Sequence, residues 1–183
     1  MRAADLTLRP ATRADQAAIA EIYNHYVLHS TCTFATEPEG PAYWETWFKE
    51  HVGVYPAIVA VRGGEVLGWG SLSSWNTRCA YRFSAEDTVY VEDPRRGQGI
   101  GRAILEELIG LARQHGHRSI LAQIAADQPA SEALHQRLGF RQAGCLKEVG
   151  YKFDRWIDVR IWQLILADDH NPENTADAPP VSQ

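Results

Sequence analysis

The segment that most constrains the fold of this chain spans residues 89–102 and reads VYVEDPRRGQGIGR. It combines a strand-forming stretch, a basic loop that contains glycines, and an amphipathic helix that starts near Gly99. In such a unit, several backbone N–H groups lie at the positive end of a helix dipole with no side chains in the way. Arg95, Arg96 and Arg102 add positive charge beside them. The segment therefore predicts a site for a ligand rich in phosphate.

The spacing of the glycines excludes two common phosphate loops. A P-loop would close with a Lys-Ser or Lys-Thr pair, which this loop lacks. A dinucleotide fingerprint would read Gly-x-Gly-x-x-Gly at a first βα turn. Residues 96–101 instead have the form Arg-x-x-Gly-x-Gly. For the loop taken by itself, an ordinary surface turn with a few arginines stays open as the alternative.

Length and composition indicate one domain followed by a tail. A chain of 183 residues with 45% hydrophobic content is large enough to bury a core. We expect a domain over residues 1–166 and a disordered acidic tail over residues 167–183, which is poor in apolar groups and contains three prolines. That tail contains four acidic and no basic residues, so it accounts for most of the net charge of −5. The nearly neutral body does not favour a nucleic-acid partner.

The cysteines and the hydropathy pattern suggest where the protein works. Cys32, Cys79 and Cys145 are few and widely scattered, which is typical neither of a disulfide framework nor of a zinc site and fits a reducing compartment. The N-terminus has no apolar stretch of the signal-peptide type, and no apolar run approaches membrane-spanning length. We therefore expect a cytoplasmic protein with no membrane partner and no metal ion.

Strand-like and helix-like segments alternate along the chain. We expect helices after Thr12, over residues 41–52, from Gly99, and over residues 129–139. We expect strands over residues 6–9, 57–61, 65–71, 83–91 and 119–124, and two extended stretches in residues 142–166 that separate near Asp154. Residues 31–36 are expected to be extended or a loop.

Three further segments carry a family resemblance. They are residues 23–38, residues 75–91 and residues 134–164. Together with the glycine loop they resemble the phosphinothricin and methionine sulfoximine acetyltransferases, a branch of the GCN5-related N-acetyltransferase (GNAT) superfamily. The resemblance covers nearly the whole chain up to Leu166. The glycine loop is typical of the superfamily, whereas Arg78, Tyr81, Glu86 and the closing Trp-Ile-Asp-Val segment are typical of the branch.

The resemblance implies a fold and an activity. The fold is of the α/β (α+β) class, with a mixed, mostly antiparallel sheet and helices on both faces. The activity is direct transfer of acetyl from acetyl-CoA to the α-amine of a small L-amino acid such as phosphinothricin, methionine sulfoximine or methionine sulfone. No metal is implied, and a homodimer is the expected assembly.

Glu86 is the candidate for the catalytic base. An α-amine is largely protonated at neutral pH and must lose a proton before it attacks a thioester. On an extended strand, Glu86, Thr88 and Tyr90 share one face, and Val89 and Val91 point to the other. The resemblance gives Glu86 the place of the family's catalytic glutamate. An exposed glutamate at a strand start is the alternative.

The resemblance also assigns the cofactor site. It implies that two central parallel strands splay apart, so that the thioester pairs with the backbone of the strand before the glycine loop, at Val89, Tyr90 or Val91. The loop is expected to bind the pyrophosphate through Arg96, Gly97, Gln98, Gly99, Ile100, Gly101 and Arg102. Gln128 stands where relatives commonly have an asparagine that contacts the pantetheine arm. His135 stands where many relatives have a tyrosine, so it is expected either to protonate the leaving thiolate or to be an ordinary helical histidine.

An arginine is the main candidate for binding the carboxylate of the acceptor. A guanidinium binds a carboxylate in bidentate fashion, and Arg78 matches the substrate-loop arginine of the family. Tyr81 belongs to the same loop, and Phe34 and Thr36 are expected to line the opposite wall. Glu86, the candidate base, is also expected to contact the acceptor. A solvated loop arginine is the alternative for Arg78. Two further readings stay open for the whole chain: an acetyltransferase for a peptide N-terminus or a polyamine, and an acyl-CoA-binding module without activity.

Overall fold

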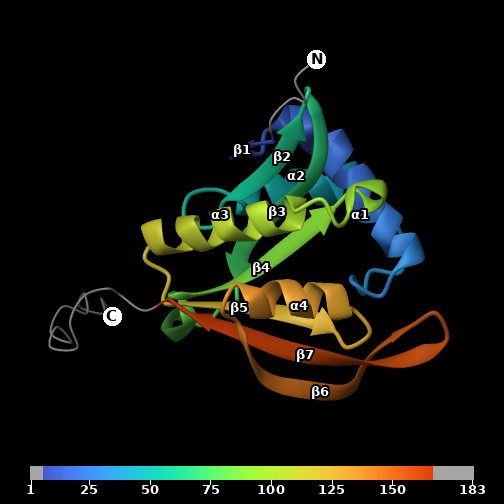
Figure 1. The fold of residues 1–183 in the computed structure, drawn as a ribbon, viewed down its shortest axis with the longest axis vertical. Coiled ribbons are helices and arrows are strands. Elements are labelled where there is room, and N and C mark those ends of the chain that lie inside the picture. The colour runs from blue at the N-terminus through green and yellow to red at the C-terminus, as the bar shows by residue number, and fades with distance from the viewer. Residues whose placement is uncertain (1–5, 167–183) are drawn as a thin grey trace, which may run out of the picture.

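The computed structural model describes residues 6–166, whose strands form one seven-stranded sheet in the order β1-β2-β3-β4-β5-β7-β6 (Figure 1). The strands are β1 (Thr7–Pro10), β2 (Ala57–Arg62), β3 (Glu65–Ser74), β4 (Ser84–Val91), β5 (Ser119–Ala125), β6 (Arg141–Lys152) and β7 (Arg155–Ile165). The helices of the described part are α1 (Gln16–His29), α2 (Pro41–Glu50), α3 (Ile100–Gln114) and α4 (Pro129–Arg137), with short 3-10 turns η1 (Arg13–Asp15), η2 (Cys79–Tyr81) and η3 (Asp93–Arg95). The expected disordered tail lies outside the described residues, so it stays a prediction.

Helices cover both faces of the sheet (Figure 1). On one face, α3 buries Ile104 and Leu108 against the strands, and α4 packs beside it. On the other face, α1 and α2 enclose an aromatic cluster in which Trp44 and Trp47 of α2 contact Trp69 of β3. This arrangement confirms the expected fold class.

The centre of the sheet contains a parallel pair whose strands diverge. Within residues 6–166, all neighbouring strands are antiparallel except β4 and β5, which α3 joins by a crossover. The last residues that pair between β4 and β5 are Glu86 and Leu121. Beyond them, β4 stays paired with β3 as far as Val91, and β5 stays paired with β7 as far as Ala125. The strands therefore leave a wedge-shaped gap in the sheet, as the family resemblance implied.

The expected elements are all present, and they differ from the expectation at their ends. The helix expected over residues 41–52 ends at Glu50, and the strand expected over residues 65–71 continues to Ser74. Residues 31–36 form a loop. The turn between β6 and β7 lies at Phe153 and Asp154, which have φ values of 52° and 58°.

Three further observations concern membranes, cysteines and metals. None of the helices in residues 6–166 is long and apolar enough to cross a membrane. Cys32, Cys79 and Cys145 are all unpaired. In the same part of the chain, no three His, Cys, Asp or Glu side chains gather closely enough to hold a metal ion.

Candidate active site

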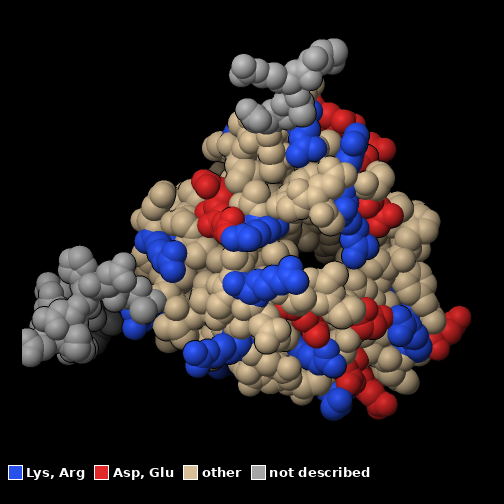
Figure 2. Space-filling view, in the orientation of Figure 1, with Lys and Arg blue, Asp and Glu red and all other residues tan. Residues whose placement is uncertain are grey.

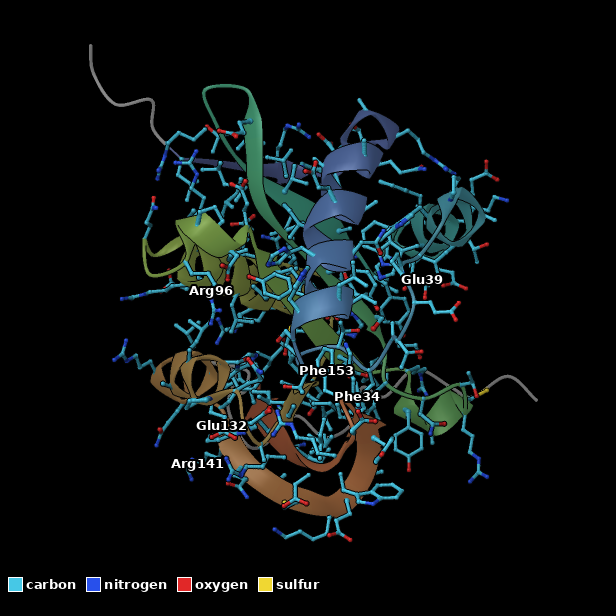
Figure 3. The ribbon with its side chains drawn as sticks, turned by 90° about the vertical axis from the view of Figure 1, so that its right-hand side faces the viewer. Phe34, Glu39, Arg96, Glu132, Arg141 and Phe153 are labelled. Carbon is cyan, nitrogen blue, oxygen red and sulfur yellow. The ribbon has the colours of Figure 1, made fainter. Side chains whose placement is uncertain are left out.

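A cleft of about 770 Å³ opens where β4 and β5 diverge. Its walls are the two strands, the loop that follows β4, the first turn of α3, and α4. Figure 2 shows a hollow near the centre of this face with Lys and Arg side chains at its rim. Figure 3 shows Arg96 between α3 and α4. The predicted site residues that line the cleft are Glu86, Val89, Tyr90, Val91, Arg96, Gly97, Gly99, Ile100, Gly101, Arg102, Gln128 and His135.

The glycine loop turns sharply into α3. Gly97 and Gly99 have φ values of 76° and 81°, a left-handed conformation that other residues rarely adopt. Gly99 immediately precedes Ile100, the first residue of α3. The N–H groups in the first turn of a helix have no partner within it, so they are available to a ligand. Local backbone geometry and helix polarity thus combine to form an anion site.

Two arginines flank this anion site, and each forms only a weak ion pair with a nearby carboxylate. The Arg96 Nη1 atom lies 3.3 Å from Asp93 Oδ1, and the Arg102 Nε atom lies 2.9 Å from Glu106 Oε1. Both arginines are exposed, and exposed ion pairs contribute little to stability. A phosphate can therefore compete with these carboxylates. The predicted residue Gln98 does not line the cleft; its Oε1 accepts a hydrogen bond from Arg62.

The far half of β4 presents its edge to the cleft. Val89 and Val91 pack toward the α3 side of the sheet, whereas Tyr90 joins the aromatic cluster below α1, as the strand alternation predicted. The Tyr26 hydroxyl donates a 2.6 Å hydrogen bond to the Val91 carbonyl oxygen and so fixes the end of the strand. Because β5 no longer pairs with this part of β4, the edge can pair with an extended, amide-containing ligand.

Glu86 lies at the narrow end of the cleft. It is partly buried, and the Gln123 Nε2 atom of β5 donates a 2.9 Å hydrogen bond to its Oε1. Burial raises the pKa of Glu86 above its ordinary value; the hydrogen bond from Gln123 opposes this shift, and the neighbouring Asp87 charge adds to it. A raised pKa makes the carboxylate a better proton acceptor at neutral pH.

His135 forms a buried pair with Asp87. The His135 Nε2 atom lies 3.0 Å from Asp87 Oδ2, and its Nδ1 atom lies 2.8 Å from the Ser131 carbonyl oxygen. Burial acts to lower the pKa of His135, but the charge and hydrogen bond of Asp87 outweigh burial, so the pKa is raised. Both ring nitrogens are therefore occupied. Sequence reasoning identified His135 but missed Asp87.

Gln128 and the loop over residues 30–36 are held together. The Gln128 Nε2 atom donates a 2.9 Å hydrogen bond to Thr31 Oγ1, and that hydroxyl donates to Asp127 Oδ1 at 2.7 Å. The buried ammonium of Lys152 donates to the carbonyl oxygens of Ser30 and Thr33, both at 2.7 Å. Burial lowers the pKa of Lys152. Sequence reasoning missed Lys152 as an anchor of this loop.

Four of the five residues predicted to bind the acceptor lie outside the lining of the cleft, whereas the fifth, Glu86, lines it. Arg78 and Tyr81 are exposed, on a loop that joins β3 to β4 at the end where Glu86 lies. Phe34 and Thr36 are exposed on the anchored loop. A Cβ atom on Gly150 would lie 2.2 Å from the Phe34 ring, so the ring sits directly against the backbone of β6.

The diverging parallel strands, the glycine loop before α3 and the half-buried glutamate are the features of an acyl-CoA-dependent transferase. Residues 19–140 match the acetyltransferase (GNAT) family. The chain therefore belongs to this family and is an acetyl-CoA-dependent N-acetyltransferase.

Relatives with known names share most of the chain. An L-methionine sulfoximine/L-methionine sulfone acetyltransferase of Salmonella typhimurium is 37% identical over 90% of this chain and 96% of its own length. A phosphinothricin N-acetyltransferase of Streptomyces viridochromogenes is 37% identical over 85% of each chain. The crystal structure of a GNAT phosphinothricin acetyltransferase from Sinorhizobium meliloti in complex with acetyl-CoA is 39% identical, with a TM-score of 0.85 over 87% of this chain and 88% of that chain.

Proposed function

We propose that this enzyme transfers acetyl from acetyl-CoA to the α-amine of a small L-amino acid such as phosphinothricin, methionine sulfoximine or methionine sulfone. The observation that carries the proposal is the position of Glu86, a partly buried carboxylate of raised pKa at the point where β4 and β5 separate. The names of the relatives, which are 37% identical, support the class of acceptor.

The cleft fits acetyl-CoA by the chemistry of its lining. The first turn of α3 and the side chains of Arg96 and Arg102 would hold the pyrophosphate, while the free edge of β4 would pair with the pantetheine arm. Gln128 would contact the same arm if its amide turns away from Thr31. When bound, the cosubstrate supplies an activated acetyl group.

The residues of the chain then have distinct roles. Glu86 takes a proton from the acceptor ammonium, directly or through a water, and such help from a positioned base contributes about 10²- to 10⁴-fold. Backbone N–H groups of residues 89–91 stabilise the negative charge that develops on the thioester oxygen. Arg78 and Tyr81 bind the acceptor carboxylate. Phe34 and Thr36 line the space that its side chain occupies. No step calls for a metal ion.

The proposal includes the cellular location, the assembly and the partners of the enzyme. We infer that it works in the cytoplasm as a homodimer, with neither membrane nor nucleic acid as a partner. Exposed aromatic side chains on β6 and β7, Tyr151 and Trp156, offer a surface for the second subunit. Acetylation of phosphinothricin would make resistance to that herbicide one consequence.

The test is acetyl-CoA-dependent thiol release across a panel of phosphinothricin, methionine sulfoximine, methionine sulfone, ordinary amino acids, polyamines and peptides. Wild type, Glu86→Gln and the exposed control Glu107→Gln are assayed side by side. We expect release with the sulfoximine, sulfone or phosphinothricin, loss of that release in Glu86→Gln, and normal release in the control. Release with polyamines or peptides only would contradict the proposed acceptor, and binding of acetyl-CoA without any release would contradict the enzymatic role.

A further inference from the structure

Two glycines of β6 have opposite surroundings. A Cβ atom built on Gly144 would meet no atom of residues 6–166 within 4 Å, apart from its chain neighbours. A Cβ atom built on Gly150 would overlap the ring of Phe34, with Cδ2 at 2.9 Å and Cε2 and Cζ closer still. Real Cβ atoms essentially never come within 3.0 Å of another heavy atom in this way. The Phe34 ring therefore occupies the place that a side chain at position 150 would take.

The backbone at position 150 does not itself require glycine. Gly150 pairs with Ile157 of β7, after the irregular part of the ladder that follows Leu146. Its φ lies outside the left-handed region, which Glu148 adopts instead. A glycine inside a strand weakens the strand, and it often marks a place where another group approaches the backbone closely. At position 150, that group is the Phe34 ring.

The same stretch of β6 holds the backbone of the loop over residues 30–36. Gly150 and Lys152 are both buried, whereas the residue between them is exposed. Alternate residues of a strand share a face, so Gly150 and Lys152 present one face to the loop. Lys152 donates hydrogen bonds to the carbonyl oxygens of Ser30 and Thr33. One end of β6 therefore fixes both the loop and the aromatic ring that the loop carries.

The loop carries Phe34 on the Glu86 side of the sheet. The Tyr90 hydroxyl donates a 3.4 Å hydrogen bond to the Cys32 carbonyl oxygen, and Tyr90 shares a face of β4 with Glu86. Cys32 and Thr33 line the cleft, as Glu86 does. In the view of Figure 3, Phe34 lies between the hairpin of β6 and β7 below it and α1 above it. A ring that is pushed off β6 therefore moves into the space on the Glu86 side.

We propose that Gly150 is a positioning residue for Phe34 and that it thereby sets the length of the acceptor side chain that the enzyme admits. The missing side chain at position 150 lets the ring lie directly against β6, which leaves more room on the Glu86 side. A larger residue at this position moves the ring into that room. The inference rests on the proposed function, which places Phe34 beside the acceptor side chain.

The test adds one methyl group at position 150 and varies the length of the acceptor. Thiol release by wild type and Gly150→Ala is measured with methionine sulfone and with S-methylcysteine sulfone, whose side chain is one methylene group shorter. Gly150→Ala should lower kcat/KM for methionine sulfone about 10-fold more than for the shorter homologue, the low end of the discrimination that one methylene group gives in a pocket. The KM for acetyl-CoA should not change. Equal losses for the two homologues would overturn the proposal.

Matched variants separate this effect from general damage to β6. Gly144→Ala adds the same methyl group to the same strand in open space, so the ratio of the two kcat/KM values should stay at its wild-type value. Phe34→Leu removes the Cε2 and Cζ atoms, which a Cβ atom at position 150 would approach most closely. In the Phe34→Leu background, Gly150→Ala should therefore change the ratio less than about twofold. A full effect in that background would contradict the proposal, because the ring would not be its cause.

A variant that keeps Gly150 gives a second test. The Phe34 side chain is 40% exposed, so its ring has room to turn aside and Gly150→Ala is expected to fold. Should that variant not fold, Phe34→Leu alone is decisive. It should raise kcat/KM for ethionine sulfone, which is one methylene group longer, about 10-fold relative to methionine sulfone. An unchanged ratio would overturn the proposal.

The two proposals fail in different ways. If no amino acid supports thiol release, the proposed function fails and the preference for side-chain length fails with it. If release by wild type is normal and Gly150→Ala affects both homologues equally, only the role of Gly150 fails.

Discussion

Glu86 of β4 and Gln123 of β5 face each other at the narrow end of the cleft, with the Gln123 Nε2 atom donating to Glu86 Oε1 at 2.9 Å. This hydrogen bond stabilises the charged carboxylate and thus opposes the rise in the pKa of Glu86 that burial causes. A base must be deprotonated to act. The rate at low substrate should therefore rise with pH through the pKa of Glu86, which lies above that of an ordinary glutamate.

Removal of the hydrogen-bond donor tests this relationship. Gln123→Ala should raise the pKa of Glu86 further, so the acidic limb of the pH profile of kcat/KM moves to higher pH. Glu86→Gln should lower kcat by about 10²- to 10⁴-fold, the range for a positioned base. An unchanged acidic limb in Gln123→Ala would show that another group controls the pH dependence.

The anion site at the start of α3 predicts a charge-dependent KM. Arg96→Ala or Arg102→Ala should raise the KM for acetyl-CoA about 10-fold, equivalent to about 1.4 kcal/mol of lost binding. Added salt should reduce the difference in KM between each variant and wild type, because salt screens exposed charges. Arg113→Ala at the far end of the same helix is exposed and serves as the control. Steady-state kinetics at two ionic strengths distinguish a lost phosphate contact from a misfolded loop. A rise in KM caused by misfolding would not become smaller when salt is added.

The fold was predictable because its signals are local. The glycine loop, the apolar face of α3 and the alternation along β4 each depend on residues close together in the sequence, and each formed as expected. Glu86 was predicted to be the base from the family resemblance, and the strand alternation added only that it shares a face with Thr88 and Tyr90. The divergence of β4 and β5 leaves no mark in the residues themselves and came only from the family resemblance.

The contacts that sequence reasoning missed join segments far apart in the chain. Asp87 and His135 are 48 residues apart, and Lys152 and Ser30 are 122 residues apart. Asp87 looks like any polar strand residue until α4 is placed over it. Lys152 looks like a solvated hairpin lysine until the loop after α1 folds against β6. Only the tertiary arrangement gives either side chain its partner.

Lys152 predicts a link between stability and acceptor binding. Lys152→Met removes two hydrogen bonds from the loop over residues 30–36 and leaves two carbonyl oxygens without their donor. Unfolding in urea should show a loss of about 1–3 kcal/mol. Because the loop also carries Phe34 and Thr36, the KM for the amino-acid acceptor should rise more than the KM for acetyl-CoA. The exposed Lys49→Met is the matched control, and an equal rise in both KM values would argue that the loop does not serve the acceptor.

The buried carboxylate of Asp15 predicts how stability depends on pH. The Arg9 guanidinium donates two hydrogen bonds to it, each at 2.7 Å, and this pairing lowers the pKa of Asp15 to about 2; burial opposes the shift, and Thr12 adds to it. A depressed pKa stabilises the folded state above the unfolded pKa of about 4, and the benefit is lost as pH falls toward 2. At pH 7, Asp15→Asn should lose about 1.5–3 kcal/mol, the range for hydrogen bonds to charged groups.

The dependence on pH separates this ion pair from a simple packing defect. The difference in unfolding free energy between wild type and Asp15→Asn should be constant from pH 7 to about 5 and should narrow as pH falls from about 4 to about 2. Glu21→Gln, an exposed carboxylate on α1, should show no such narrowing. Urea unfolding at a series of pH values measures all three proteins. A difference that stays constant down to pH 2 would mean that the Asp15 charge contributes nothing, and that the variant is destabilised by its altered shape alone.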